Sequence, residues 1–124
     1  HVPELSGAYG VLARLELVMA KARLAIDLRA NRPMLVDHPE LLWREARHPL
    51  LIFSLKGKRP VVPLNISLLP SDRMLLVSGP NAGGKSVCLK TVGLIQYMVQ
   101  CGLLVPVHPD SRVGIFQHLL LDIG

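Results

Sequence analysis

Aromatic side chains are scarce in this 124-residue chain, making up only 4% of its residues. A hydrophobic core must therefore consist mainly of leucine, valine and isoleucine, and there are enough of them because 50% of the residues are hydrophobic. Stacking of nucleobases on aromatic side chains is not expected. The length and composition fit one globular domain with an appendage.

Cysteine is also rare. The two cysteines, Cys88 and Cys101, lie on one predicted helix, and thirteen positions separate them by about 20 Å along its axis. Neither belongs to a CxxC pair, so we expect reduced thiols rather than a disulfide or a metal site. No uncharged apolar run has membrane-spanning length, and the N-terminal residues lack a signal-peptide pattern. We therefore expect a cytoplasmic protein without a membrane partner.

Acidic residues are outnumbered, with 14 lysines and arginines against 9 aspartates and glutamates, a net charge of +5. This excess suits a polyanionic partner, but a phosphate site would account for part of it. Three histidines, His38, His48 and His108, each precede a proline. Their spacings match no metal-ligand pattern, so they are interpreted as turn or strand-edge residues.

The most informative stretch runs from Leu75 to Ser86. It matches the phosphate-binding pattern G-x-x-x-x-G-K-[ST], with an apolar run before it and helical periodicity after it. Glycines let the backbone curl around a polyphosphate, and the start of the following helix adds positive potential. Lys85 would reach the β- and γ-phosphates, and the Ser86 hydroxyl would coordinate Mg²⁺.

This pattern predicts a site for ATP or ADP with Mg²⁺, and the alternative is a glycine-rich turn that binds nothing. The predicted nucleotide-binding residues are Gly79, Asn81, Ala82, Gly83, Gly84, Lys85 and Ser86.

Helix and strand signals alternate around this loop. We expect a strand at Leu75–Val77, a helix over 86–100 that ends before Gly102, and a second strand at Leu103–Val105. A right-handed crossover would make the two strands parallel and place the loop at their carboxyl end.

Prolines break residues 34–71 into short elements. Strands are expected at 41–43, 50–53 and 64–68, with Trp43 packed against the sheet. The basic residues Lys56–Arg59 are interpreted as a solvated turn.

Apolar residues near the N-terminus recur three or four positions apart. They predict a long amphipathic helix over Ala8–Ala30, capped by Ser6. Its narrow apolar stripe, called the seam below, would pack against another helix. Contact of its basic face with DNA is a minor alternative. Because no second long helix is predicted, we expect the isolated chain to self-associate through this seam. The seam consists of Leu12, Leu15, Met19, Ala22 and Ile26.

The predicted fold is therefore α/β. It comprises half of a P-loop NTPase domain, with a parallel or mixed sheet and a flanking helix, preceded by the long amphipathic helix.

Several segments resemble one family. Gly79–Ser86 resembles the G-P-N-x-G-G-K-[ST] loop of the MutS ATPases. Ala46–Leu50 is similar to the A-R-H-P segment of that family, and Val62–Asn65 to the segment that enters its nucleotide-binding sheet. Leu89–Leu94 and Asp122–Gly124 are closest to its second, non-mismatch-repair branch. The resemblance extends from about residue 8 to the end.

The resemblance implies that residues 1–32 form the end of a lever helix and residues 33–124 the first part of a P-loop ATPase domain. The intact protein would be a homodimeric ATPase that clamps branched DNA in recombination control or acts on stalled ribosomes. The family stacks adenine partly on an aromatic residue where this chain has Arg59–Val62, so the resemblance does not define base recognition.

The apolar run Leu119–Leu121 is followed by an acid, Asp122. This arrangement resembles the second nucleotide-binding motif, in which an apolar strand ends in an acid that binds Mg²⁺. In the resembled family, however, the Mg²⁺-binding acid and the catalytic glutamate come later in the chain. We therefore name no catalytic residue and expect nucleotide binding with near-background hydrolysis. Little specific DNA binding is expected at physiological salt. The competing hypothesis is an interaction module that pairs through its N-terminal helix and carries a vestigial loop.

Overall fold

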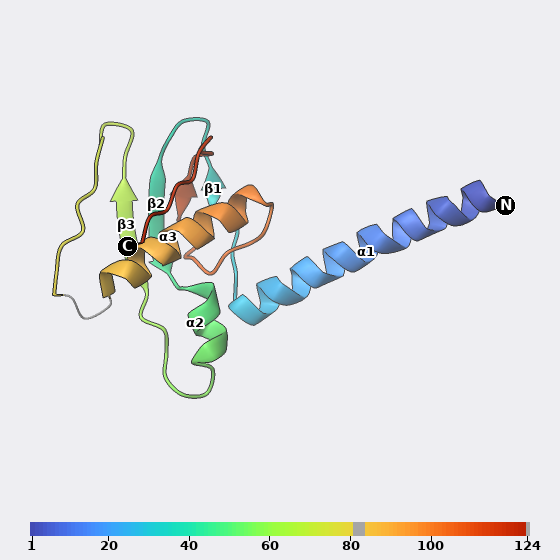
Figure 1. Ribbon diagram of the computed structural model, residues 1–124, viewed down its shortest axis with the longest axis horizontal. Coiled ribbons are helices and arrows are strands. Elements are labelled where there is room, and N and C mark those ends of the chain that lie inside the picture. Colours follow the sequence, from blue (N-terminus) through green and yellow to red (C-terminus); the bar gives the residue numbers. More distant parts are fainter. Residues whose placement is uncertain (81–83, 124) are drawn as a thin grey trace.

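The computed structural model describes residues 1–80 and 84–123 (Figure 1). Its elements follow in the order α1 (Val2–Leu28), β1 (Met34–Leu35), β2 (Leu41–Ala46), α2 (Pro49–Ser54), β3 (Leu64–Leu68), α3 (Gly84–Gln100) and β4 (Arg112–Val113). The fold is α/β with a long N-terminal helix, as predicted.

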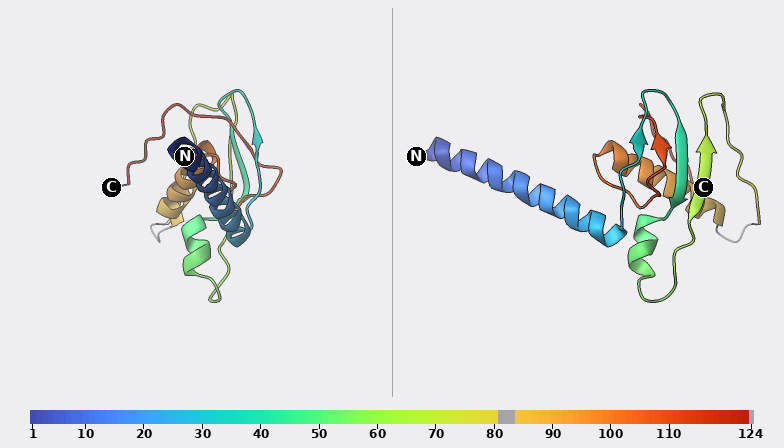
Figure 2. Two further views of the ribbon diagram at one scale, coloured as in Figure 1. Left: turned by 90° about the vertical axis from the view of Figure 1, so that its right-hand side faces the viewer. Right: turned by 180° about the vertical axis from the view of Figure 1, so that it is seen from behind.

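Four strands form one mixed sheet in the order β1-β4-β2-β3. β2 runs antiparallel to β3 and β4, whereas β1 and β4 are parallel. α3 lies across one face of this sheet, and the core forms between them (Figures 1 and 2). Trp43 of β2, Ile95 of α3 and Val113 of β4 are completely buried. The packing of Trp43 against the sheet is thus confirmed.

The helix predicted over 86–100 is confirmed and begins two residues earlier. Past its end, Gly102 has a φ of 76°, a left-handed conformation that glycine adopts without steric cost. The N–H of Gly102 donates to the Val99 carbonyl at 2.9 Å, and the N–H of Leu103 donates to the Met98 carbonyl at 3.0 Å. These two bonds close the helix in a Schellman motif, as the position of Gly102 predicted.

The predicted strand at Leu50–Phe53 is wrong, because these residues belong to helix α2. Pro49 occupies the first turn of this helix, where its missing N–H is not needed and its fixed φ favours helix formation. A short apolar run alone cannot distinguish a strand from a helical turn. The turn predicted at Lys56–Arg59 is present and follows α2.

The predicted pair of parallel strands is also wrong. Residues 75–77 have no regular structure, and Leu76 is 84% exposed. Val105 forms only an isolated antiparallel bridge with Asn31, and Leu119–Leu121 are exposed and irregular. A strand requires backbone partners, and local apolar content does not reveal which partners the fold supplies.

Helix α1 starts earlier and ends earlier than predicted. It begins at Val2 with Pro3 in its first turn, so Ser6 is not its cap. It ends at Leu28, where Arg29 adopts the left-handed conformation and the Ala30 N–H bonds back to the Ala25 carbonyl at 2.8 Å. No helix in the described part of the chain is long and apolar enough to span a membrane.

Most of α1 projects away from the sheet and α3 (Figures 1 and 2). Its C-terminal end packs on the body through Leu24 and the buried Leu28. In contrast, the large seam residues are more than half exposed, for example Leu12 at 55% and Met19 at 53%. The seam therefore has no partner among the described residues.

We expect the isolated chain to form dimers or larger assemblies through this seam, because soluble monomers rarely expose a contiguous apolar stripe. Leu15→Glu, which places a charge in the seam, should shift the chain toward monomer in light scattering over a concentration series. Ala13→Glu adds the same charge at least about 100° around the helix axis from any seam residue, so it should change the association little. A monomer at high concentration, unaffected by Leu15→Glu, would contradict this expectation.

Candidate nucleotide-binding site

The predicted phosphate loop connects the irregular residues 71–80 to α3. Asn81, Ala82 and Gly83 lie outside the described residues. Gly84 begins α3, and Lys85 and Ser86 stand in its first turn, which contains no acidic side chain. The positive end of this 17-residue helix is therefore not neutralised by its own side chains and can attract an anion.

A cavity of about 620 Å³ opens beside the start of α3. This volume is in the range of small-molecule sites. A β-carbon on Gly84 would meet no described atom within 4 Å, so packing within the described chain does not require glycine there. The absence of a side chain leaves this wall of the cavity open to a ligand.

Three segments that are distant in sequence form the cavity walls. One is the first turns of α3, with Gly84, Val87, Cys88 and Thr91. The second is the end of β2 together with α2, and the third is the extended run Arg59–Leu64. Both cysteines of the chain are free; Cys88 is half-buried in this wall, and Cys101 is exposed at the far end of α3.

His48 is the residue at this site that sequence analysis missed. It is the N-cap residue of α2 and lines the cavity. Its Nδ1 is buried and has no hydrogen-bond partner among the described residues. Burial lowers the pKa of His48, and the positive charge of Lys90 lowers it further. A neutral ring offers one donor and one acceptor to a ligand. The sequence signal that could have identified His48 was its position in the A-R-H-P segment.

The metal-binding part of the prediction concerns Ser86. Ser86 is exposed in the first turn of α3. Within the described residues, no three histidine, cysteine, aspartate or glutamate side chains form a group that could hold a metal ion. Asp122 lies in the exposed, irregular C-terminal segment. A Mg²⁺ ion would therefore depend on Ser86, on water and on phosphate oxygens, the ligand set that this ion usually takes in nucleotide sites.

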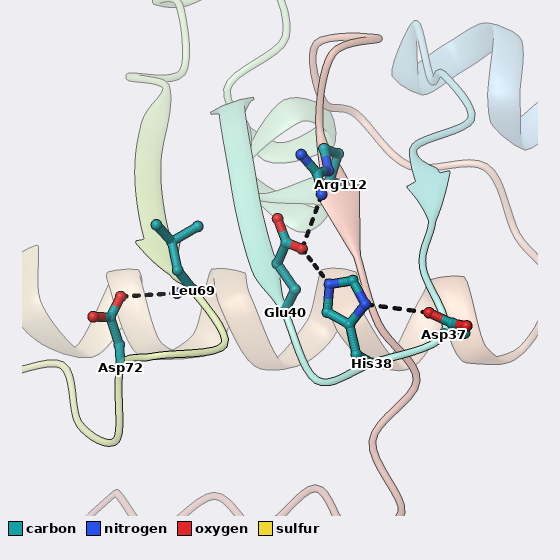
Figure 3. Close-up of polar contacts among 6 residues, drawn as sticks. All are labelled: Asp37, His38, Glu40, Leu69, Asp72 and Arg112. Atoms are coloured by element: carbon teal, nitrogen blue, oxygen red, sulfur yellow. Dashed lines mark hydrogen bonds and ion pairs between the residues drawn. The ribbon is translucent and has the colours of Figure 1, made fainter.

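A separate polar cluster lies before the start of β2 (Figure 3), whereas His48 follows the end of that strand. Glu40 is only 3% exposed, and its Oε2 is 2.7 Å from Nε2 of His38 and 3.1 Å from a guanidinium nitrogen of Arg112. Asp37 lies 3.2 Å from the other ring nitrogen of His38. The hydrogen bonds to Glu40 and then to Asp37 raise the pKa of His38 above its ordinary value of 6.5.

This raised pKa predicts the sign of a pH effect on folding. The stabilisation from protonated His38 is complete below pH 6.5 and is lost as the pH rises through the higher pKa of the folded state. An NMR titration should find the His38 pKa above 6.5. Glu40→Gln should lower it more than Asp37→Asn does. A wild-type value at or below 6.5 would contradict the assignment.

The chain matches no protein-family model. It is 38% identical over all 124 residues to a protein of Carboxydothermus hydrogenoformans named Endonuclease MutS2. Proteins of the same name from Finegoldia magna and Lactobacillus acidophilus are 45% identical over 114 residues and 41% identical over 123 residues. These alignments cover 92% to 100% of this chain and 14% to 15% of each relative. The chain therefore spans about 15% of the length of these relatives.

The similarity runs through the N-terminal helix and the phosphate loop alike, since it covers the whole chain. On this evidence the chain belongs to the MutS family, in the second branch that the MutS2 proteins represent.

Proposed function

We propose that this chain binds a nucleoside triphosphate, ATP, together with Mg²⁺. The observation that carries the proposal is that Gly84 of the phosphate loop borders the cavity of about 620 Å³. A loop suited to phosphates thus adjoins a space that can accept a nucleoside. Membership of the MutS family supports the same function.

In the proposed complex, the loop 79–86 holds the phosphates. The backbone N–H groups of the loop and the start of α3 face the negative charge. The Lys85 ammonium neutralises the β- and γ-phosphates, and Ser86 contributes an oxygen to Mg²⁺. Bound Mg²⁺ would offset the charge of the phosphate oxygens.

The cavity beyond the loop receives the nucleoside. Val87 and Val61 provide apolar surface there, and the neutral ring of His48 borders it. The Thr91 hydroxyl already donates to the Val87 carbonyl at 2.7 Å. The hydroxyl hydrogen of Thr91 is therefore already used within α3. No phenylalanine, tyrosine or tryptophan is among the described residues that line this cavity, so the His48 ring is the one described side chain there that offers an aromatic face to a base.

For the whole protein, residues 1–32 would be the end of a lever helix and residues 33–124 the first part of the ATPase domain. The protein would act as a homodimer that couples nucleotide binding and hydrolysis to clamping on branched DNA or to action on stalled ribosomes. The relatives are named endonucleases, which favours a nucleic-acid target.

Hydrolysis needs a positioned carboxylate, and the described residues offer none beside the loop, so this chain should bind without efficient turnover.

A second candidate is a pairing module. The observation that favours it is the exposed seam of α1, which could associate with another helix whether or not the loop binds nucleotide.

The two free cysteines provide a test of the nucleotide site. Cys88 lines the cavity and its burial raises the pKa of its thiol, whereas Cys101 is exposed directly after the end of the same helix. At a nucleotide concentration of ten times Kd, Mg·ATP should slow alkylation of Cys88 about tenfold if the occupied site is shielded. The alkylation rate of Cys101 should not change. Mass spectrometry of each cysteine peptide measures both rates.

Two controls separate site occupancy from other effects. Lys85→Ala should abolish the protection of Cys88, and tripolyphosphate, which lacks a nucleoside, should protect it less than ATP does. An equal decrease in the alkylation rates of Cys88 and Cys101 would indicate that Mg·ATP reduces the accessibility of the whole chain rather than of this site. The proposal fails if millimolar Mg·ATP leaves the Cys88 rate of the folded wild-type chain unchanged.

A further inference from the structure

A second and larger cleft lies on the other side of the run Arg59–Pro63, with a volume of about 960 Å³. It is bounded by the end of α1, the end of β2, the turn after α2 and the loop Pro106–Pro109. Figure 1 shows the C-terminal end of α1 beside α2. The phosphate-loop residues 84–86 do not line this cleft.

Basic residues dominate its charge. Five cationic side chains line the cleft against two acidic ones, Asp27 and Glu45. Among the described residues that line it there is no phenylalanine, tyrosine or tryptophan, and His108 lies in the Pro106–Pro109 loop. The salt bridges among the described residues involve none of the five cations. The five, which come from three separate parts of the sequence, are Arg29, Arg47, Lys56, Lys58 and Arg59.

The same cleft contains unusual backbone geometry. Among the described residues, Arg29 and Glu45 are the two that are not glycine and have positive φ, at 48° and 49°. Both line the cleft. Arg29 is the left-handed C-cap that ends α1, and Glu45 lies at the shift in register between Trp43 and Ala46 of β2, so both conformations belong to the chain turns that shape the cleft wall. The Glu45 N–H donates to Oδ1 of Asn65 at 2.9 Å, which holds this part of β2 beside β3.

We propose that this cleft binds the sugar–phosphate backbone of a nucleic acid. An excess of unpaired cations in one concave surface attracts a chain of phosphates, and three guanidinium groups can each grip phosphate through two hydrogen bonds. Without phenylalanine, tyrosine or tryptophan in its described lining, the cleft contacts mainly the backbone rather than the bases, so binding depends little on sequence and strongly on salt.

Nucleic acid fits the cleft better than an acidic protein segment does. The planar guanidinium groups suit phosphate, and the similar proteins are named endonucleases. The proposal does not depend on nucleotide binding, because four of the five cations do not line the nucleotide cavity; Leu55 and the run Arg59–Pro63 border both spaces. It also refines the expectation of little specific DNA binding, which rested on cations distributed along the sequence. The structure gathers Lys56, Lys58 and Arg59 with Arg29 and Arg47, whereas Arg14 and Arg23 stand apart on the projecting helix.

Fluorescence anisotropy with a short labelled DNA duplex of mixed sequence, at about 50 mM salt, tests the proposal. Lys56→Glu combined with Lys58→Glu should weaken binding at least about tenfold and reduce the slope of log Kd against log salt by about two, since each phosphate contact contributes about 0.9. Arg14→Glu combined with Arg23→Glu makes the same charge change on α1 and should cost less than about twofold. Lys85→Ala should bind the duplex like the wild type.

Three results would overturn the proposal. The first is no binding of the duplex by the folded wild-type chain at low salt. The second is an equal loss in both double variants, which would show that diffuse charge binds DNA. The third is polyglutamate binding more tightly than the duplex and depending on Lys56 and Lys58, which would assign the cleft to an acidic protein. The nucleotide affinity of the Lys56→Glu, Lys58→Glu variant should remain unchanged, so a failure here is distinct from a failure of the nucleotide site.

Discussion

Replacing Gly114 with alanine is expected to destabilise the fold by about 3 kcal/mol or more, because the new side chain has no space. Gly114 is buried directly after β4. A β-carbon at this position would overlap the carbonyl oxygen of His38 and lie 3.1 Å from the amide nitrogen of Glu40. These are backbone atoms, which cannot rotate away as a side chain can.

Relieving this overlap would also break the contacts that join β4 to its neighbours. The Gly114 N–H donates to the Glu40 carbonyl at 2.8 Å, and Nε2 of Gln96 donates to the Gly114 carbonyl at 3.0 Å. Each such bond contributes about 1 kcal/mol. For a domain of this size, 3 kcal/mol corresponds to a fall in Tm of roughly 10 to 20 °C.

Thermal unfolding followed by circular dichroism measures this effect, and Gly10→Ala is the matched control. A β-carbon at Gly10 would meet nothing within 4 Å, and Gly10 lies inside α1. Alanine there should stabilise the helix by up to about 1 kcal/mol. Equal melting temperatures for Gly114→Ala and the wild type would show that β4 does not pack against β2 as described.

The sequence predicted the elements whose signals are local. The helix α3 has a repeating apolar pattern and a glycine at its end, so both its extent and its closure at Gly102 could be predicted. The strands β2 and β3 were predicted because prolines and turn residues separate short apolar runs. Trp43 was expected in the core because a tryptophan on a strand rarely stays in water.

The errors concern pairing between distant parts of the chain. The strands Met34–Leu35 and Arg112–Val113 are two residues long and exist because they pair with each other across more than seventy positions. Leu75–Val77 has a stronger apolar pattern but pairs with no strand in the described part of the chain. Periodicity cannot show which segments meet, so it missed β4 and predicted a strand at 75–77 instead.

The candidate sites also differ in whether their residues are contiguous in the sequence or brought together by the fold. The phosphate loop is a contiguous motif, so the sequence alone predicted it. The cavity beside it is assembled from α3, His48 and the run Arg59–Leu64, and the basic cleft joins Arg29 to cations about thirty positions later. Three-dimensional proximity of this kind leaves no periodic trace in a sequence, and the structure was needed to find it.

Removing the Lys85 side chain is expected to weaken Mg·ATP binding about 10- to 100-fold, which corresponds to the roughly 1.5 to 3 kcal/mol of a hydrogen bond to a charged group. Lys85 stands in the first turn of α3, where its ammonium adds to the positive end of the helix. Lys90 controls for the loss of one positive charge near the site, because it is an exposed lysine of the same helix whose charge acts on His48 but which does not line the cavity. Lys90→Ala should therefore keep most of the affinity.

Isothermal titration calorimetry with Mg·ATP tests the central claim most directly. We predict a saturable, one-to-one binding heat for the wild-type chain and for Lys90→Ala, and a heat that is weak or absent for Lys85→Ala. Circular dichroism of each variant establishes that the chain is folded. A folded wild-type chain that gives no binding heat, or a Lys85→Ala variant that binds as tightly as the wild type, would contradict the assignment of a nucleotide site to this loop.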